Sequence, residues 1–327
     1  MKKFFSLTLA VLLMLTSALS LSSCSEQTHK VSVYALDTLV EITLPALSDG
    51  EDGDATPLVM SGLHYYEDIF SATREGSELY KLNHSTEETV AVSDELFAVL
   101  LGAHALAAET NGAYDYTCGA LTEVWKINDP DAPLPTESEI ENALDLVGYE
   151  RVTLADGKIT RPVGMKIDLG GVAKGYIAER LTELLAEKGY GWGILSLGGN
   201  ISVFGERDEP FSVGVKNPEK PTAVHGKLTL DGGFVSVSGV YERNKTVDGV
   251  LYHHIFDVKT GRCADSDILS VAVVSDDGAL ADALSTALFV MGKDKALAYL
   301  SDNAEVGAVI FLKNGEVLTV NTVYEKI

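Results

Sequence analysis

Apolar and polar residues follow two different periods along this chain, and each period predicts its own kind of element. Alternation with period two is typical of half-buried strands, and spacing of three to four residues is typical of amphipathic helices. The predicted strands are 31–35, 39–44, 192–197, 201–204, 211–216, 224–230, 234–238, 268–275, 306–312 and 317–320. The predicted helices are 57–69, 93–112, 137–147, 170–188, 278–291 and 293–301.

Local signals fix several of these boundaries. Ser93 precedes two acids at a helix start, and Thr136 with Glu139 has the spacing of a capping box. Asn314-Gly315 is a hairpin turn between the last two strands. Helices interspersed among these strands indicate an α+β fold with mixed, mostly antiparallel sheets, rather than a doubly wound parallel sheet.

The first residues have the pattern of a lipoprotein signal. Two lysines precede an apolar run over 4–19, and Leu21-Ser22-Ser23-Cys24 follows. The run is too short for a stable spanning helix and is typical of a secretory signal peptide. Its end resembles a bacterial lipobox, which predicts removal of 1–23, a lipidated Cys24 and a polar stalk to residue 30. Ordinary cleavage beside an incidental cysteine is the disfavoured alternative.

The charge of the chain limits its ligands. The formal net charge is −23, and loss of residues 1–23, with two lysines and no acids, makes it −25. So acidic a protein will not bind nucleic acid through general electrostatics, and an anionic ligand would need a local cation or a metal. A hydrophobic content of 46% and a charged content of 22% are globular values, and the roughly 300 remaining residues are enough for one large domain or two modest ones. A single domain over 31–327 is the preferred interpretation.

Two features that invite a chemical interpretation are better explained structurally. Cys118 and Cys263 are not spaced as zinc ligands would be. A disulfide between them is possible, but the preferred interpretation is that both are small buried hydrophobic residues. The acidic segment 48–54 lacks the ligand spacing of a calcium loop and is interpreted as a solvated turn.

Glycines follow predicted strands at two places. In Asp168-Leu169-Gly170-Gly171 a strand is expected to end at the acid and a helix to begin after the glycines, with Lys174 close behind. Free N–H groups at such a helix start suit phosphate, although a plain turn is about equally favoured. For Leu197-Gly198-Gly199-Asn200 a tight turn is the better interpretation.

Oxygen-bearing side chains recur on later elements. Asp282 and Thr286 are four residues apart on a predicted helix, so both oxygens project from one face, as a magnesium site would need. Taken alone, the pair is better interpreted as a charge near the helix N-terminus and a filler residue. Ser236 and Ser238 on a strand, followed by the adjacent histidines 253 and 254, are compatible with a nucleotide pocket and a proton-transfer group.

These stretches occur in the order found in one family. The segments 70–83, 112–115, 168–175, 197–200, 236–241, 254–261 and 281–292 together resemble the ApbE family of FAD:protein FMN transferases. The resemblance covers roughly 31–320, nearly all of the mature chain. It implies that FAD binds with its pyrophosphate at Mg²⁺, that an acceptor Ser or Thr hydroxyl attacks the FMN phosphorus, and that AMP leaves.

The resemblance also implies roles for individual residues. The implied metal ligands are Asp282, Thr286, a main-chain carbonyl near Gly171 and, in some members, a residue at Ser285. The implied cofactor-binding residues are Ala113, Tyr114, Asp115, Asp168, Lys174, Ser236, Ser238 and Ile255. His254 matches a histidine that assists transfer, as general base toward the acceptor hydroxyl. For His253 a structural role is preferred.

The chain departs from the family pattern at four positions. Leu36 replaces a usual Met, Thr73 replaces a frequent aromatic residue, Cys118 replaces a Val, and Val258 replaces a common Pro. The first two changes could weaken stacking against a flavin or adenine ring. None removes an implied metal ligand.

The sequence therefore predicts an enzyme that transfers FMN from FAD to an exported acceptor. The expected acceptor is a domain of a membrane redox complex of the Rnf or Na⁺-translocating type, or another exported flavoprotein. The expected location is the extracytoplasmic face of a cell membrane, held by the lipid on Cys24. The alternatives are hydrolysis of FAD to FMN and AMP at the same metal site, and a non-catalytic, lipid-anchored flavin-binding protein.

Overall fold

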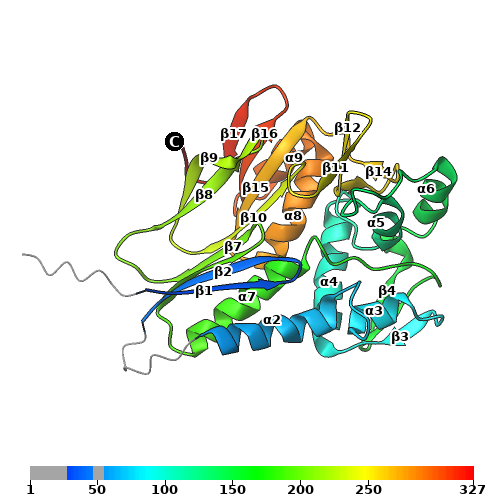
Figure 1. Ribbon diagram of the computed structural model, residues 1–327, viewed down its shortest axis with the longest axis horizontal. Coiled ribbons are helices and arrows are strands. Elements are labelled where there is room, and N and C mark those ends of the chain that lie inside the picture. The colour runs from blue at the N-terminus through cyan, green and yellow to red at the C-terminus, as the bar shows by residue number, and fades with distance from the viewer. Residues whose placement is uncertain (1–27, 47–54) are drawn as a thin grey trace, which may run out of the picture.

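The computed structural model describes residues 28–46 and 55–327, and its central feature is an eight-stranded sheet (Figure 1). In spatial order the strands are β1 (Thr28–Ala35), β2 (Thr38–Pro45), β6 (Trp192–Leu197), β7 (Asn200–Gly205), β10 (Gly233–Gly239), β15 (Ile268–Ser275), β16 (Gly307–Leu312) and β17 (Val317–Val320). All neighbouring pairs are antiparallel. Because β2 pairs with β6, the long helical segment between them is an insertion at one side of the sheet.

Helices cover one face of this sheet. They are α2 (Thr56–Phe70), α3 (Glu78–Asn83), α4 (Asp94–Glu109), α5 (Gly119–Trp125), α6 (Glu137–Leu144), α7 (Ala173–Glu187), α8 (Gly278–Met291) and α9 (Lys293–Asp302), with a 3₁₀ turn at Tyr149–Arg151. The helix α8 packs against β10, β15 and α7, while α7 packs against β6 and β7. These two helices therefore form the inner layer next to the sheet.

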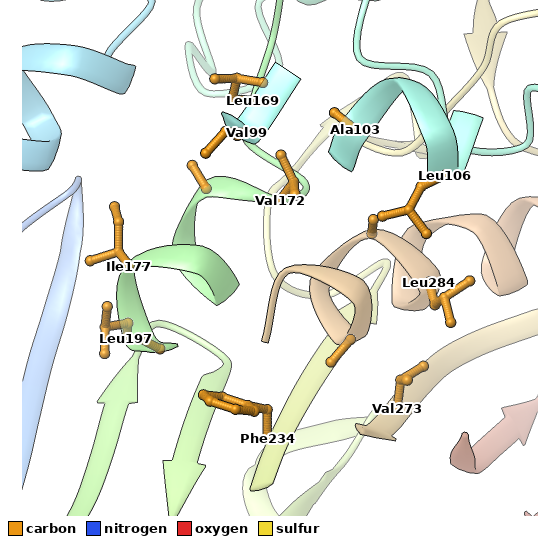
Figure 2. Close-up of a cluster of buried hydrophobic side chains, with 14 of the residues drawn as sticks. Val99, Ala103, Leu106, Leu169, Val172, Ile177, Leu197, Phe234, Val273 and Leu284 are labelled. Atoms are coloured by element: carbon orange, nitrogen blue, oxygen red, sulfur yellow. The ribbon is translucent and has the colours of Figure 1, made fainter. Parts of the chain in front are cut away.

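The main core lies between that face and the helices. Figure 2 shows side chains from α4, α7, α8 and the strands converging on one another; the labelled residues are Val99, Ala103, Leu106, Leu169, Val172, Ile177, Leu197, Phe234, Val273 and Leu284. Nearly all the cluster's members are inaccessible to solvent. Burial of this much apolar surface is the dominant favourable term that fixes the helical layer on the sheet.

The opposite face of the sheet is covered by a smaller sheet. It consists of β8 (Phe211–Asn217), β9 (Lys220–Leu230) and β18 (Tyr324–Lys326), in the order β18-β9-β8. A second core fills the space between the sheets and includes Trp192, Phe211, Val213 and Leu228. Because both faces of the sheet are covered, β15 is buried along most of its length, and its side chains do not alternate between buried and exposed.

Short elements complete the fold beside the helical layer. Three strands, β3 (Thr89–Ala91), β4 (Thr153–Ala155) and β5 (Lys158–Thr160), form a small sheet. Two hairpins follow later in the chain: β11 (Asn244–Val247) with β12 (Val250–His253), and β13 (Phe256–Asp257) with β14 (Arg262–Cys263). A third apolar cluster joins α5 and α6 to Phe256.

The α+β prediction is confirmed. Each predicted helix has a counterpart in the structure, and so does each predicted strand except the one expected to end at Asp168. Three expectations need correction. The third helix ends at Leu144 rather than at residue 147, and the chain before Asp168 makes only an isolated bridge between Lys166 and Cys118 instead of a strand. The fourth helix begins at Ala173, because the N–H groups of Val172 and Ala173 both bond to the Leu169 carbonyl in a turn.

Some expectations concern residues at the edge of the described chain or beyond it. The signal segment 1–23, Cys24 and the acidic turn 48–54 lie outside the described residues. Residues 28–30, expected in the stalk, instead form the start of β1, paired with β2. Within residues 28–46 and 55–327, no helix is both long enough and apolar enough to cross a bilayer.

Candidate active site

A cavity of about 470 Å³ opens where the helical insertion meets the edge of the sheet layer. Its walls come from α5 and the loop after it, the loop before α7, the β6–β7 turn, the end of β10, the segment after β12, and α8. Most sequence-predicted site residues line it: Ala113, Tyr114, Asp115, Asp168, Gly171, Lys174, Ser238, His254, Ile255, Asp282 and Thr286. Its size is within the range of small-molecule sites.

The loop before α7 is held rigidly by its own side chains. Asp168 Oδ1 accepts a hydrogen bond from the Gly170 N–H at 2.8 Å, and Oδ2 accepts one from the Thr122 hydroxyl at 2.7 Å. Lys174 folds back so that Nζ donates to the Gly170 carbonyl at 2.9 Å. Asp168 therefore ties the glycine turn to α5, and the lysine is kept at the cavity wall.

Two glycines bring α7 and α8 into direct contact. A Cβ at Gly175 would collide with the Gly278 carbonyl, and a Cβ at Gly278 would collide with the Gly175 carbonyl. This close approach lets the Gly175 N–H donate to Asp282 Oδ2 at 3.1 Å. Asp282, which is only 6% exposed, is thus oriented by a neighbouring helix at the point where it lines the cavity.

Three hydroxyls cluster next to that carboxylate. Ser238 Oγ on β10 lies 2.7 Å from Ser285 Oγ and 3.3 Å from Thr286 Oγ1 on α8. Thr286 also faces the glycine turn, because a Cβ at Gly171 would lie 3.4 Å from its Oγ1. Asp282, Thr286 and the Gly171 backbone are therefore brought together as expected.

Two predicted site residues lie behind the cavity instead of lining it. Ser285 is fully buried and donates to the Asp282 carbonyl at 2.8 Å, as expected for a helix hydroxyl with no room to point outward. Ser236 is buried and donates to the Asn200 side chain. Both support residues that line the cavity, which corrects the expectation of direct ligand contact.

Tyr114 and Asp115 differ in how their polar groups are used. Asp115 accepts hydrogen bonds from Thr117 N–H at 2.8 Å and from Tyr149 N–H at 3.1 Å, so it mainly closes a turn. Burial raises the Asp115 pKa, and these hydrogen bonds oppose that rise. Tyr114 Oη is buried and has no hydrogen-bond partner among the described residues. Burial, with Cys118 and Asp282 nearby, raises the Tyr114 pKa, so the phenol keeps its proton as a donor for a ligand.

The two histidines have separate environments. His253 is 7% exposed, packs edge-on against Phe289, and accepts from the Ile255 N–H, in agreement with a structural role. His254 lines the cavity, and its Nδ1 lies 3.2 Å from the Arg243 carbonyl. Burial, and then the nearby Arg243 and Lys174 charges, lower the His254 pKa to about 3. Its ring is therefore neutral at pH 7.

Further residues line the cavity that sequence reasoning did not select. They are Thr122, Glu123, Lys126, Ile127, Asn128, Asp129, Asn200, Glu242, Arg243 and Phe256. Most lie on α5 and the loop after it or at the start of the β11–β12 hairpin. No motif marks these segments, and only their packing against the glycine turns brings them to the site.

The four departures from the family pattern are distributed unevenly. Thr73, Cys118 and Val258 line the cavity, whereas Leu36 sits with Asp37 in the β1–β2 turn, where both residues have positive φ. Cys118 and Cys263 are free thiols, and both are only partly buried, whereas two buried residues were expected. Burial raises the pKa of both thiols.

In the part of the chain that the structure describes, acid and imidazole groups alone do not form a metal cluster. Across residues 28–46 and 55–327, no three His, Cys, Asp or Glu side chains are grouped so that they could hold a metal ion. Any cation at the cavity would need hydroxyl and main-chain oxygens beside Asp282. That donor set is suited to magnesium and not to zinc.

Several known proteins are similar to this chain in sequence and in fold. A FAD:protein FMN transferase of Klebsiella pneumoniae (strain 342) is 31% identical over 258 residues, which is 77% of this chain and 80% of that protein. The protein of the same name from Treponema pallidum (strain Nichols) is 32% identical over 283 residues, 79% of this chain and 77% of that protein. The solved structure of the ApbE protein of Thermotoga maritima has a TM-score of 0.84 at 34% identity, covering 90% of this chain and 97% of the other. The flavin transferase ApbE of Vibrio cholerae has a TM-score of 0.79 at 25% identity, covering 92% and 97%.

The curated relatives are all of one class of enzyme, because each is named as a FAD:protein FMN transferase. The model of the ApbE family matches residues 36–310 of this chain. The chain belongs to the ApbE family, and the resemblance inferred from its motifs is confirmed.

Proposed function

We propose that this protein is a magnesium-dependent FAD:protein FMN transferase that acts on a Ser or Thr hydroxyl of an exported acceptor. The observation that carries the proposal is the convergence, in one cavity, of the Asp282–Thr286 oxygen pair, the glycine turn at 170–171 and the neutral His254. The names of the curated relatives support the reaction class.

The residues at the cavity fit a magnesium ion. Asp282 and Thr286 supply carboxylate and hydroxyl oxygens, and the Gly171 main chain faces the same point. These are hard-oxygen donors, which magnesium prefers. Magnesium bound there would neutralise phosphate charge and stabilise the departing AMP phosphate. Tyr114 Oη, the buried hydroxyl without a partner in the described chain, is available to bind a phosphate or flavin acceptor atom.

The transfer exchanges one phosphorus–oxygen bond for another. The acceptor oxygen bonds to the FMN phosphorus, and the bond from that phosphorus to the bridging oxygen breaks, so that AMP leaves with the oxygen. The hydroxyl proton must go to a base. The Arg243 carbonyl can only accept, so we assign the proton of neutral His254 to Nδ1, which leaves Nε2 with a free lone pair.

The basicity of His254 depends on what the cavity contains. Lys174 and Arg243 help to depress its pKa to about 3, a value too low for efficient proton transfer at neutral pH. A bound pyrophosphate would offset these two positive charges. We therefore expect FAD binding to raise the pKa of His254 toward the working range.

The test is mass spectrometry of an acceptor domain that carries an exported Asp-x-x-Ser/Thr-Gly-Ala-Ser/Thr-like segment. After incubation with the protein, FAD and Mg²⁺, we expect a mass gain equal to FMN less water, and none with Asp282→Ala. Free FMN and AMP without an adduct would instead establish FAD hydrolysis. Bound, unconsumed FAD under the same conditions would favour a flavin-binding protein without catalysis.

The location of the enzyme is a separate proposal. The Leu-Ser-Ser-Cys pattern ending at Cys24 supports lipid anchoring at the extracytoplasmic face, where an Rnf-type or Na⁺-translocating redox complex would present its acceptor domain. Metabolic labelling with a palmitate analogue tests this. Label that is incorporated in the wild type and lost in Cys24→Ser supports the anchor, and equal labelling of both, or of neither, contradicts it.

A further inference from the structure

The hairpin β11–β12 has an inverted pattern of burial. Lys245 on β11 is only 4% exposed, while Val250 and Leu251 on β12 are 52% and 45% exposed. Lysine is among the residues least often buried, and strands usually turn apolar side chains inward. The inversion therefore calls for a specific partner of the lysine.

The partners of Lys245 are main-chain carbonyls at the end of α5 and in the loop that follows it. Its Nζ donates to Trp125 O at 2.9 Å, to Ala132 O at 3.2 Å and to Lys126 O at 3.4 Å. An ammonium has three N–H donors, and three carbonyls receive them here. The last carbonyls of a helix lack intrahelical partners and carry partial negative charge, which a cation satisfies.

The segment held by Lys245 is one wall of the cavity. Residues 126–129, immediately after α5, all line it. The hairpin that carries Lys245 begins just after Arg243 and ends just before His254, and both of these also line the cavity. The lysine therefore joins two walls that are more than a hundred residues apart in sequence.

A second contact supports the same wall from the other side. The Trp125 indole N–H donates to the Gly261 carbonyl at 2.8 Å, and its ring packs near Tyr252 and Phe256. The helix α5 ends directly after it, at Lys126 in the left-handed conformation. With α5 ended, the wall segment has no helix of its own to hold it.

We propose that Lys245 is a positioning residue that holds segment 126–129 against the His254 hairpin and so keeps the cavity in its FAD-binding shape. The inference rests on the proposed function, because it assigns this cavity to FAD. Lys245 does not line the cavity itself. It acts through the main chain of the wall.

The expected effect is on binding more than on turnover. Lys245→Met keeps the length of the side chain but removes the three donors. Lys126 O keeps its hydrogen bond from the Asp129 N–H, whereas Trp125 O and Ala132 O lose the bond that Lys245 donates to them. The wall would then occupy its binding position only part of the time, and the apparent Kd rises by the inverse of that fraction. We expect the Kd for FAD and the KM for FAD to rise about tenfold while kcat at saturating FAD changes by less than about twofold.

Two further substitutions of Lys245 and one control variant test this expectation. Lys245→Arg keeps the charge and the donors, and should recover most of the FAD affinity; Lys245→Gln keeps two N–H donors and should give an intermediate Kd if the Met variant does not fold. Val213→Ala, in the core between the two sheets, is the matched control for general destabilisation. It should lower the melting temperature and leave the Kd for FAD unchanged.

Tryptophan fluorescence reports directly on the environment of the cavity wall next to Trp125. The chain has two tryptophans, so in a Trp192→Phe background Trp125 is the sole indole emitter. Lys245→Met should shift its emission to longer wavelength, and Val213→Ala should not. Wild-type affinity and emission in Lys245→Met, or equal losses of affinity in Val213→Ala, would overturn the proposal. Absence of FMN transfer by the wild-type protein would instead count against the proposed function.

Discussion

The two faces of the eight-stranded sheet are covered in different ways, and only one of them carries the cavity. On the helical face, α7 and α8 meet through glycines, and polar groups of Asp282, Thr286 and Gly171 lie at the contact. On the other face, a three-stranded sheet packs through large apolar side chains such as Phe211 and Leu228. Polar chemistry is found where small residues allow backbones to approach, and stability is supplied where large residues fill the space.

The largest expected effect comes from removing the carboxylate on the helical face. Asp282→Ala should lower kcat/KM for FMN transfer about a thousandfold, about 4 kcal/mol in transition-state free energy, because the phosphates lose their metal ligand. The measurement is the initial rate of FMN transfer at subsaturating FAD. Asp277→Ala is the control. Asp277 is the N-cap of the same helix, and its carboxylate accepts a hydrogen bond from the Leu280 N–H. Its removal should cost about 1 kcal/mol of stability with little loss of rate.

A second change separates the two helices that frame the site. Gly175→Ala places a methyl group against the Gly278 carbonyl and should cost about 3 kcal/mol in unfolding free energy, together with loss of FAD binding. Urea denaturation and FAD titration measure the two effects. A Cβ added at Gly102 on α4 would meet no other atom within 4 Å, so Gly102→Ala should stabilise by roughly 0.5–1 kcal/mol. Equal effects of the two substitutions would contradict the packing argument.

A substitution on the opposite face of the sheet should change stability without changing activity. Val213→Ala removes buried apolar volume between the sheets and should cost about 2 kcal/mol of unfolding free energy. Val237 of this core also lines the cavity, but Val213 does not, so kcat and KM should stay close to wild-type values below the melting temperature. A changed KM for FAD would show that the two faces are coupled.

At neutral pH the smallest expected effect is that of His254, whose contribution to stability changes only as the pH falls. The pKa of His254 is depressed to about 3 in the folded protein, so between pH 3 and 6.5 the unfolded chain binds a proton that the folded chain does not. Its contribution to stability is complete above pH 6.5 and is lost as the pH falls toward 3. His254→Gln should therefore reduce the slope of stability against pH over that interval, by at most about 1.4 kcal/mol per pH unit. Urea denaturation at pH 5 and 7 measures it, and an unchanged slope would contradict the assignment.

Much of the fold follows from local patterns. Apolar strands such as 268–275 and capped helices such as the one opened by Ser93 were found at nearly the observed bounds. Short elements were missed: α5 and the β11–β12 hairpin are too brief to show a period, and their positions depend on contacts such as the one between Lys245 and Trp125. At the site, the motif-bearing residues were found, but Arg243 and segment 126–129 were not.

The sequence by itself determined the longer helices and strands, the α+β class, the family and a set of residues whose types suit phosphate and a metal, because these depend on local spacing and residue type. Only the tertiary structure decided which of those residues share one cavity. It placed Ser236 and Ser285 behind the cavity, buried Lys245 beneath its wall, and set the low pKa of His254 through burial and neighbouring cations. Such properties depend on contacts between distant segments, which no local pattern encodes.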